Sequence, residues 1–224
     1  MFWDTRKPSK LLGGYWESHS DDITSVLFHP SSPATLASGS TDGQVNIFDT
    51  SQSDEDSALT TSLHTEDSVS KLAWYSRSGD ADQLAVSTHT EGLQLWATAD
   101  VGAHTVLSRS DLCHGVRRTA SEHAYIAGLH AVQNGDGLEV LVGSSYTASP
   151  CLRLAFVKNK KAKPCGELRE AKGEVRCSLS LAEGLLTGGE DGVVRLWKEG
   201  EVEDGGKDDS SKMVNKNKVR NKPY

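Results

Sequence analysis

The sequence has few of the features that mark membrane proteins and the common nucleotide-binding or metal-dependent enzymes. No apolar run comes near the length of about 18 residues that crosses a bilayer, and residues 1–10 are polar rather than signal-like. Neither a GxxxxGK[ST] nor a GxGxxG phosphate-binding loop occurs, and the histidines form no His-Glu-x-x-His motif. We therefore expect an intracellular protein, cytoplasmic or nuclear or both, that works without a membrane, a cofactor or a metal.

Cysteine is scarce. The four cysteines, at positions 113, 151, 165 and 177, include no Cys-x-x-Cys pair, whereas zinc sites usually place two ligands a few residues apart. We interpret them as reduced thiols. A metal site is the less favoured alternative, because its one candidate group lies in polar sequence without consistent ligand spacing; the group is Cys113 with His104, His114 and His123.

An excess of basic charge is also missing. The chain has 24 Lys and Arg against 31 Asp and Glu, and the resulting net charge of −7 excludes a generally cationic nucleic-acid or membrane binder. Apolar residues make up 36% of the sequence and 21 glycines accompany them, which is enough for a buried core. The length of 224 residues fits one large domain or two small ones.

What the sequence does contain is an internal repeat. Residues 36–48 align with residues 185–197, and both passages read as a strand, an Asp-Gly turn and a second strand that ends at an aromatic residue. Apolar side chains alternate with polar ones along each strand, which predicts one buried face. The pairs Asp42-Gly43 and Asp191-Gly192 favour the left-handed backbone of a tight hairpin.

Weaker copies fill the rest of the chain. A second unit ends at Trp96 after Glu91-Gly92, and the distance from Trp96 to Trp197 leaves room for a degenerate unit around residues 140–156. Each unit has a further candidate strand upstream, at residues 23–28, 69–74, 125–129 and 175–179. Each unit therefore supplies three or four short strands, with a period in the forties.

Four-stranded units with this period, an Asp-Gly turn and an aromatic-Asp ending resemble the WD-repeat β-propeller family. The resemblance covers residues 2–198, and the residues that carry it are Trp3-Asp4, His19, Ser38, Asp42, Phe48-Asp49, Thr187, Asp191 and Trp197. It implies an all-β fold and a non-catalytic scaffold that binds other proteins.

The resemblance also divides the chain into blades. We expect the end of a preceding blade at residues 1–17 and three blades at residues 18–64, 65–110 and 111–168, the third of them degenerate. A last blade without its outer strand follows at residues 169–198, and a disordered charged tail at residues 199–224. About four blades are present, whereas propellers of this family mostly have seven. We therefore expect the C-terminal part of a longer protein or a truncated isoform. The alternative is an open arc that exists alone or is closed by a partner.

In this family a His, a Ser or Thr, an Asp and a Trp of one blade typically form a buried hydrogen-bonded tetrad. The remnants here are His19, Ser38, Asp42 and Phe48 in one unit, His64 and Trp96 in the next, and Thr187, Asp191 and Trp197 in the last. No unit has all four: Phe48 cannot donate an indole N–H, Val86 stands where Ser or Thr belongs, and Ala171-Lys172 replaces the expected Gly-His.

The same residue types, His19, Ser38 and Asp42, could form a hydrolase triad. We favour the structural interpretation, because these offsets match the tetrad and no Gly-x-Ser-x-Gly elbow is present. No catalytic residue is therefore assigned.

Two basic stretches support an alternative function, namely a nuclear or RNA- and ribosome-assembly-associated propeller. They comprise Lys158, Lys160, Lys161 and Lys163 in a predicted outer loop, and Lys216, Lys218, Arg220 and Lys222 in the tail. A solvated loop and a disordered tail explain them equally well. Residues 51–57, with Asp54-Glu55-Asp56, are interpreted as an acidic solvated loop.

Overall fold

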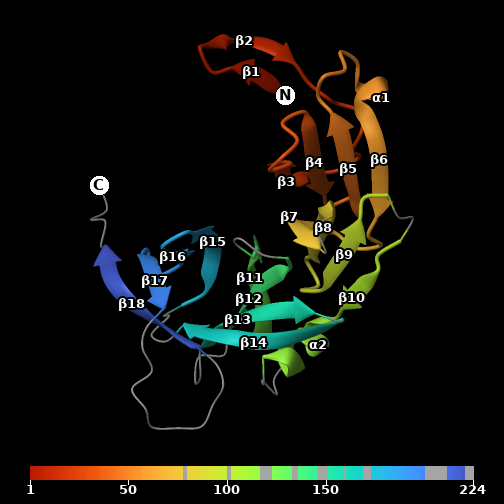
Figure 1. Cartoon of the computed structure of the whole chain (residues 1–224). Helices are drawn as coiled ribbons and strands as arrows, with labels where there is room; N and C mark the ends of the chain where they lie inside the picture. The colour runs from red at the N-terminus through yellow and green to blue at the C-terminus, as the bar shows by residue number, and fades with distance from the viewer. Residues whose placement is uncertain are drawn as a thin grey trace, which may run out of the picture.

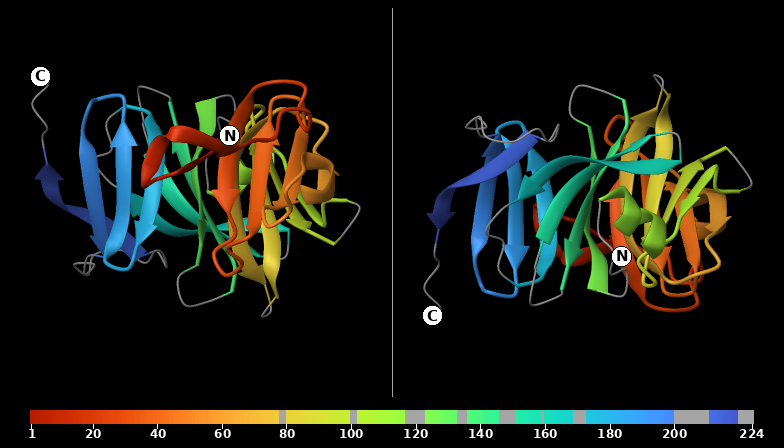
Figure 2. Two further views of the ribbon diagram at one scale, coloured as in Figure 1. Left: turned by 90° about the horizontal axis from the view of Figure 1, so that it is seen from above. Right: turned by 90° about the horizontal axis from the view of Figure 1, so that it is seen from below.

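The computed structural model describes residues 1–77, 80–99, 102–116, 123–132, 136–145, 151–158, 160–168, 173–199 and 211–219. These residues form antiparallel β-units that follow one another in chain order along an open arc (Figure 1). Seen from above and below, strands of neighbouring units stand side by side (Figure 2). The predicted all-β fold of four-stranded propeller blades is confirmed.

Four units of four strands follow an N-terminal hairpin. The hairpin consists of β1 (Phe2–Asp4) and β2 (Lys7–Gly13). Units 1 and 2 consist of β3 (Ile23–Phe28), β4 (Thr35–Ser40), β5 (Gln44–Asp49) and β6 (Leu59–His64), and of β7 (Val69–Arg77), β8 (Asp80–Thr88), β9 (Leu93–Ala97) and β10 (Thr105–Leu107). Units 3 and 4 consist of β11 (Ala124–Ala131), β12 (Leu138–Ser144), β13 (Cys151–Lys158) and β14 (Lys161–Leu168), and of β15 (Val175–Leu181), β16 (Gly184–Gly189), β17 (Val194–Glu199) and β18 (Ser211–Val219). Helix α1 (Glu55–Ala58) precedes β6 and helix α2 (Arg109–Gly115) follows β10.

The core lies between the faces of successive units. One buried cluster joins units 1 and 2 around Trp74 and Trp96, a second joins units 2 and 3 around Leu93 and Leu138, and a third joins units 3 and 4 around Trp197. The first strands β3, β7, β11 and β15 contact one another in that order and form the inner side of the arc. Consecutive residues are buried along β4 and β5, so the predicted burial of one face only is wrong in these two strands.

A β-bulge interrupts each inner strand, and near the bulges of β7, β11 and β15 a side chain of the preceding unit binds a backbone group. The Thr24 hydroxyl donates to the Val69 carbonyl at 2.9 Å. The Lys71 ammonium donates to the Ile126 carbonyl at 2.9 Å. The Tyr125 hydroxyl accepts from the Val175 N–H at 2.8 Å. A chain of side-chain-to-backbone bonds therefore links β3, β7, β11 and β15.

The bulge in β11 is held on both sides. While Lys71 binds the Ile126 carbonyl, the Glu91 carboxylate accepts from the Ile126 N–H at 2.6 Å. Glu91 itself has φ +63°, a left-handed conformation that is uncommon for a residue with a side chain. Burial lowers the pKa of Lys71, partly offset by the charge of Glu91.

The two Asp-Gly turns have the predicted left-handed glycine. Gly43 has φ +79° and Gly192 has φ +69°. Each N–H bonds to the carbonyl three residues earlier, at 3.3 Å from Gly43 to Ser40 and 3.1 Å from Gly192 to Gly189. The loop between β4 and β5 comprises residues 41–43 and the loop between β16 and β17 comprises residues 190–193, so neither hairpin has a two-residue loop.

The N-terminal hairpin is attached to unit 1 by a carboxylate that the sequence assigns to a solvated loop. Glu55, the first residue of α1, accepts from the backbone N–H groups of Trp16, Glu17 and Ser18 at 2.7, 2.9 and 2.8 Å. Its pKa is lowered because these bonds and one from the Ser18 hydroxyl outweigh the effect of burial. The interpretation of residues 51–57 as a purely solvated loop is wrong at Glu55.

An aromatic stack reinforces this attachment. Tyr15 lies against Phe48 with ring centroids 4.6 Å apart, and Phe2 meets the Tyr15 ring edge-on at 5.1 Å. Phe48 is almost fully buried by these contacts. The position that lacks a tryptophan therefore serves as the base on which the N-terminal segment packs.

Unit 4 differs from its expected form. The sequence predicts that the last blade lacks an outer strand and that residues 199–224 are disordered, but β18 pairs antiparallel with β17, and its first three residues pair in parallel with the last three residues of β14. Units 3 and 4 thus share one eight-stranded sheet. A polar, Lys-rich segment can form this strand because an outer strand has little apolar surface to bury. Residues 200–210 and 220–224 lie outside the described residues.

Apolar side chains stay exposed on the inner strands at both ends of the arc. Val26 and Phe28 of β3 are 58% and 53% exposed, and Leu179 of β15 is 57% exposed. In the described part of the chain, α1 and α2 are short and neither reaches the length and hydropathy of a membrane-spanning helix. The four cysteines carry free thiols, with Cys113 buried and Cys177 exposed.

We predict that Lys71→Met destabilises the protein by about 1–3 kcal/mol, the usual result of leaving a buried carbonyl without its donor. Urea unfolding of this variant and of Lys10→Met, whose lysine is exposed on β2, measures the effect. Equal free energies of unfolding for the two variants would show that the bulge bond does not contribute.

We also predict a pH dependence that belongs to His130. This ring is buried between β11 and β15, where Ser178 lies 2.9 Å from Nε2, and burial lowers its pKa from 6.5 to about 4. The unfolded chain takes up this proton first, so stability is full above pH about 6.5 and falls as the pH drops toward about 4. His130→Gln should flatten this part of the stability profile, whereas His64→Gln, at an exposed position, should leave it unchanged.

Candidate functional site

The predicted triad-like residues of unit 1 meet in one hydrogen-bonded network. His19 Nδ1 lies 3.0 Å from Asp42 Oδ2, and Nε2 lies 2.7 Å from the Ser38 hydroxyl. The turn places Asp42, because its carboxylate also accepts from the N–H groups of Ser20 and Gln44, both at 2.9 Å. Strand β4 and the loop before β3 thus position the three side chains.

The network is closed to solvent. The side chains of His19 and Asp42 are 5% and 4% exposed. Burial raises the pKa of Asp42, but the hydrogen bonds from Ser20, Gln44 and His19 outweigh it and the pKa is lowered overall. An ionised, fully engaged carboxylate in this place holds a turn rather than activating a serine for an external substrate.

Unit 2 is organised differently from the prediction. Trp96 donates its indole N–H to Gln94 at 3.2 Å, and Gln94 in turn donates to the Thr65 carbonyl at 2.8 Å. His64 lies exposed at the end of β6 and is not part of this arrangement. The assignment of His64 to a tetrad remnant is therefore wrong, because Gln94 supplies the polar partner within the same strand as the tryptophan.

In unit 4 the tetrad residues Thr187, Asp191 and Trp197 form two separate hydrogen-bonded pairs, one of them with Arg195. The Trp197 indole donates to the Thr187 hydroxyl at 2.8 Å, and both residues are buried. Arg195, 4% exposed, binds Asp191 through both guanidinium nitrogens, with one distance of 3.2 Å. An arginine on β17 thus does what the missing histidine would do; residues 171–172, where that histidine was expected, lie outside the described residues.

A set of residues that the sequence interpretation missed recurs in all four units. Each lies on the third strand and pairs with the second: Asn46 pairs with Ser38, Gln94 with Val86, Arg153 with Val142 and Arg195 with Thr187. Asn46, Gln94 and Arg153 each donate to a carbonyl upstream of their unit's inner strand, at Ser18, Thr65 and Val116. The signal was available as a polar residue between two apolar neighbours on the third strand.

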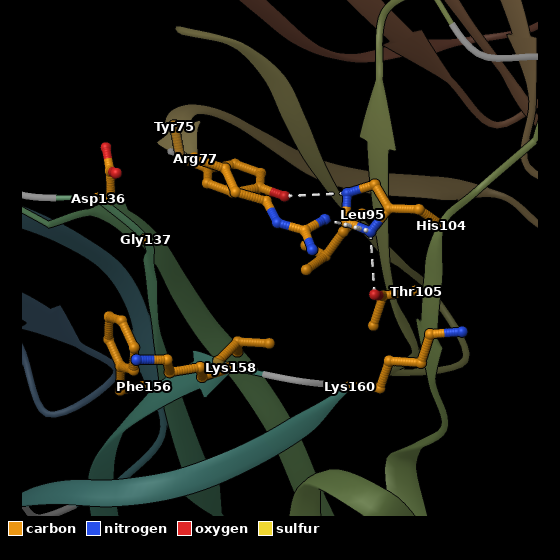
Figure 3. Close-up of a pocket in the computed structure, with 11 residues that line it drawn as sticks. Tyr75, Arg77, Leu95, His104, Thr105, Asp136, Gly137, Phe156, Lys158 and Lys160 are labelled. Carbon is orange, nitrogen blue, oxygen red and sulfur yellow. Dashed lines mark hydrogen bonds between the residues drawn. The ribbon is translucent and has the colours of Figure 1, made fainter. Parts of the chain in front are cut away.

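A cavity near the predicted basic residues lies between units 2 and 3 and has a volume of about 620 Å³ (Figure 3). Tyr75 and Arg77 reach it from the end of β7, His104 and Thr105 from the start of β10, and Lys158 from the end of β13. Figure 3 shows His104 at the centre of the hydrogen bonds drawn there. The Tyr75 hydroxyl lies 3.3 Å from His104 Nε2. The Arg77 guanidinium and the Thr105 hydroxyl lie 3.3 Å and 3.0 Å from His104 Nδ1.

The predicted basic residues lie in different parts of the structure. Lys158 and Lys160 line the cavity. Lys161 and Lys163 are exposed on β14 rather than in a loop, because β13 and β14 form a hairpin whose strands pair from Lys158 and Lys161 onward. Lys216 and Lys218 fall in β18, and Arg220 and Lys222 lie outside the described residues.

A metal site finds no support within the residues the structure describes, where no group of three or more His, Cys, Asp or Glu side chains is arranged to hold an ion.

Comparison with known proteins places this architecture in a class. Residues 10–49 match the family model described as WD domain, G-beta repeat. The chain aligns over its whole length, at 29% identity, with WD repeat-containing protein GTS1 of Arabidopsis thaliana and spans 61% of that protein's length. It is 38% identical over 88 residues to WD repeat-containing protein 89 homolog of Dictyostelium discoideum, covering 39% of this chain and 24% of that protein.

These matches, together with the four-stranded units, show that the chain is similar to proteins of the WD-repeat family. Proteins of this family generally act as scaffolds for protein interactions.

We predict that Asp42→Ala and Arg195→Leu each destabilise the protein by about 1–3 kcal/mol, because each leaves buried polar partners unpaired. Ser51→Ala, in an exposed turn, is the control. Thermal melts that do not separate the two variants from this control would show that the networks contribute nothing to stability.

Proposed function

We propose that this chain is a non-catalytic scaffold that binds other proteins through the loops and exposed strand faces of its units. The observation that carries the proposal is the closed state of the His19, Ser38 and Asp42 network, in which the side chains hold one another and the backbone. Residues that are engaged in holding the units together leave the exposed loops as the surface on which a partner can be recognised.

One such loop is the segment before β3. Asp21 and Asp22 are exposed there, next to the buried network that fixes the loop through His19 and Ser20. A rigidly held loop with exposed charge loses little conformational entropy when a partner binds. An intracellular location, cytoplasmic or nuclear, is part of the same proposal.

We predict that Asp21→Lys combined with Asp22→Lys reduces the recovery of specific partner proteins by about tenfold, the effect of losing a contact worth more than 1 kcal/mol. Affinity purification with quantitative mass spectrometry measures the recovery. The control, Lys7→Glu combined with Lys10→Glu, changes as many charges on β2 and should retain the partners. Fluorophosphonate labelling of the wild-type chain above the level of Ser38→Ala would contradict the non-catalytic assignment.

The alternative is an RNA-associated scaffold. Exposure of Lys161 and Lys163 on one strand is the observation that favours it. It requires an RNA affinity that falls with salt and is lost in the double variant Lys161→Gln, Lys163→Gln. Unchanged binding of RNA by that variant at low salt removes the alternative.

A further inference from the structure

The N-terminal segment covers one face of unit 1 only in part. Cross-strand pairing places Phe28, Leu36 and Phe48 in one row across β3, β4 and β5. Leu36 and Phe48 are 5% and 2% exposed, because the N-terminal segment packs against them. Phe28 is 53% exposed, and Val26, on the same side of β3, is 58% exposed. The covering therefore ends between β4 and β3, and we call the uncovered residues Val26 and Phe28 the β3 strip.

The equivalent side chains of the next inner strand are buried. Counted from the bulge in each strand, the β3 strip corresponds to Leu72 and Trp74 of β7. These two residues belong to the apolar cluster that joins units 1 and 2, where unit 1 covers them. The β3 strip is thus a surface of the kind that the rest of the arc buries, and its burial by another chain is favourable.

A free strand edge borders the β3 strip. Strand β1 pairs with β2 on one side, and within the described residues no strand pairs with its other edge. Figure 1 shows β1 on the inner side of β2, toward the interior of the arc. The outer strand β2 exposes Lys7, Pro8 and Lys10, which are residue types that keep another strand from adding to an edge. β1 has neither Lys nor Pro, and its single charge, Asp4, is bound by Arg6. The inner edge of the hairpin is therefore the one open to a further strand.

Strand β1 is held in place over unit 1. Its residue Phe2 packs against the cluster that contains Leu36 and Phe48, so β1 lies over the β4 and β5 part of the unit. Glu55 and the ring of Tyr15 fix the segment that follows β2. Neighbouring strands of a sheet lie about 4.8 Å apart. A strand added to the inner edge of β1 would therefore lie over the β3 strip.

Trp3 indicates which side chains such a strand would carry. It occupies the aromatic position of β1 and is 50% exposed, whereas Trp197, at the same position of unit 4, is fully buried. There the neighbouring strand places Leu185 opposite Trp197, and the Thr187 hydroxyl two residues later accepts the indole N–H at 2.8 Å. A Leu-x-Thr segment would thus cover Trp3 with its leucine and threonine. The side chain between them would turn to the opposite face, onto the β3 strip.

We infer that an extended segment of a partner protein binds along the inner edge of β1, pairs with its backbone and buries an apolar side chain on the β3 strip. In this mode of recognition the main chain provides affinity and alternate side chains provide specificity. The surface continues the existing contact between the N-terminal segment and unit 1, which already fixes β1, so little conformational entropy of the edge is lost on binding. The inference rests on the proposed function, because the segment must belong to another protein.

Anisotropy of a dye-labelled, end-blocked peptide, titrated with the full chain, tests the inference. The peptide is Glu-Gly-Leu-Leu-Thr-Gly-Gly-Glu, the sequence of residues 183–190. Saturable binding is expected, at least about tenfold tighter than for the rearranged peptide Gly-Thr-Leu-Gly-Glu-Gly-Leu-Glu, which has the same composition without the Leu-x-Thr pattern.

Backbone methylation of the peptide tests the strand pairing without changing the protein. Successive N–H groups of an extended strand point to opposite edges, and only one edge of the peptide faces β1. N-methylation of one of the two adjacent leucines should therefore weaken binding at least about tenfold, and N-methylation of the other should change it less than about threefold. Binding through apolar side chains alone would respond equally to both.

Substitutions in the protein locate the bound segment. Val26→Asp should weaken binding at least about tenfold, because it places a charge under the buried side chain, whereas Val106→Asp, at a valine of β10 that is 63% exposed, should not. Trp3→Phe and a Thr→Val change in the peptide remove the same hydrogen bond. Each should weaken binding about fivefold, and together they should weaken it no more than either alone. Trp16→Phe, also at an exposed tryptophan, should bind like the wild type.

A second copy of the chain is the competing occupant. Its own Leu-x-Thr strand in unit 4, β16, is paired on both sides by β15 and β17 and is not free to add to β1. Light scattering should therefore show a monomer across the concentrations used for binding. A dimer that Val26→Asp abolishes would instead assign the β3 strip to a second copy and overturn the inference.

Absence of saturable binding, equal affinity for the rearranged peptide, or equal effects of the two methylations would also overturn the inference. If the peptide fails to bind while partner proteins are still captured and Val26→Asp does not affect them, the docking assignment is wrong and the scaffold function stands. If the peptide binds as expected but no partner depends on either Val26 or the loop before β3, the scaffold function is wrong.

Discussion

The structure depends on how the backbone of each inner strand is satisfied where a bulge interrupts its ladder. An inner strand that paired regularly along its length would bind only its own unit. Near the bulges of β7, β11 and β15, Thr24, Lys71 and Tyr125 of the preceding units bind one carbonyl or N–H of each strand. Because a buried backbone group without a partner is unfavourable, each unit requires the one before it. The apolar clusters between units supply most of the energy, and these bonds set the relative position of the units.

A second constraint acts within each unit, on its third strand. Asn46, Gln94 and Arg153 reach from the third strand to the loop that leads into the inner strand, so the outer and inner parts of a unit are tied at one end. In unit 4 the corresponding Arg195 turns to Asp191 instead. This third-strand position holds a polar residue in every unit, but the group that accepts its hydrogen bond differs between units. This difference explains how units with different tetrad remnants keep the same architecture.

The repeat in the sequence predicted the units, their Asp-Gly turns and their apolar faces, because these features depend on local alternation and on one glycine with positive φ. The assignments that failed depend on contacts between distant segments. Glu55 looks like part of a solvated acidic run until the backbone of residues 16–18 is placed over it. The outer strand β18 has no apolar pattern because its neighbours, rather than a core, determine it. The cavity combines residues from β7, β10 and β13, so no spacing in the sequence reveals it.

The double pairing of β18 has a mechanical consequence. Since β18 runs antiparallel to β17 and pairs in parallel with β14 through residues 211–213, a force that pulls residue 219 away from the sheet loads the β17 ladder first. The β17 ladder is long, whereas the β14 ladder joins only Gly166, Glu167 and Leu168 to β18. Such a force would peel the long ladder gradually from the Val194–Val219 pair and reach the short β14 ladder last. Units 3 and 4 would then separate at their outer edges while β11 and β15 remain in contact, so the arc would open like a hinge around its inner strands.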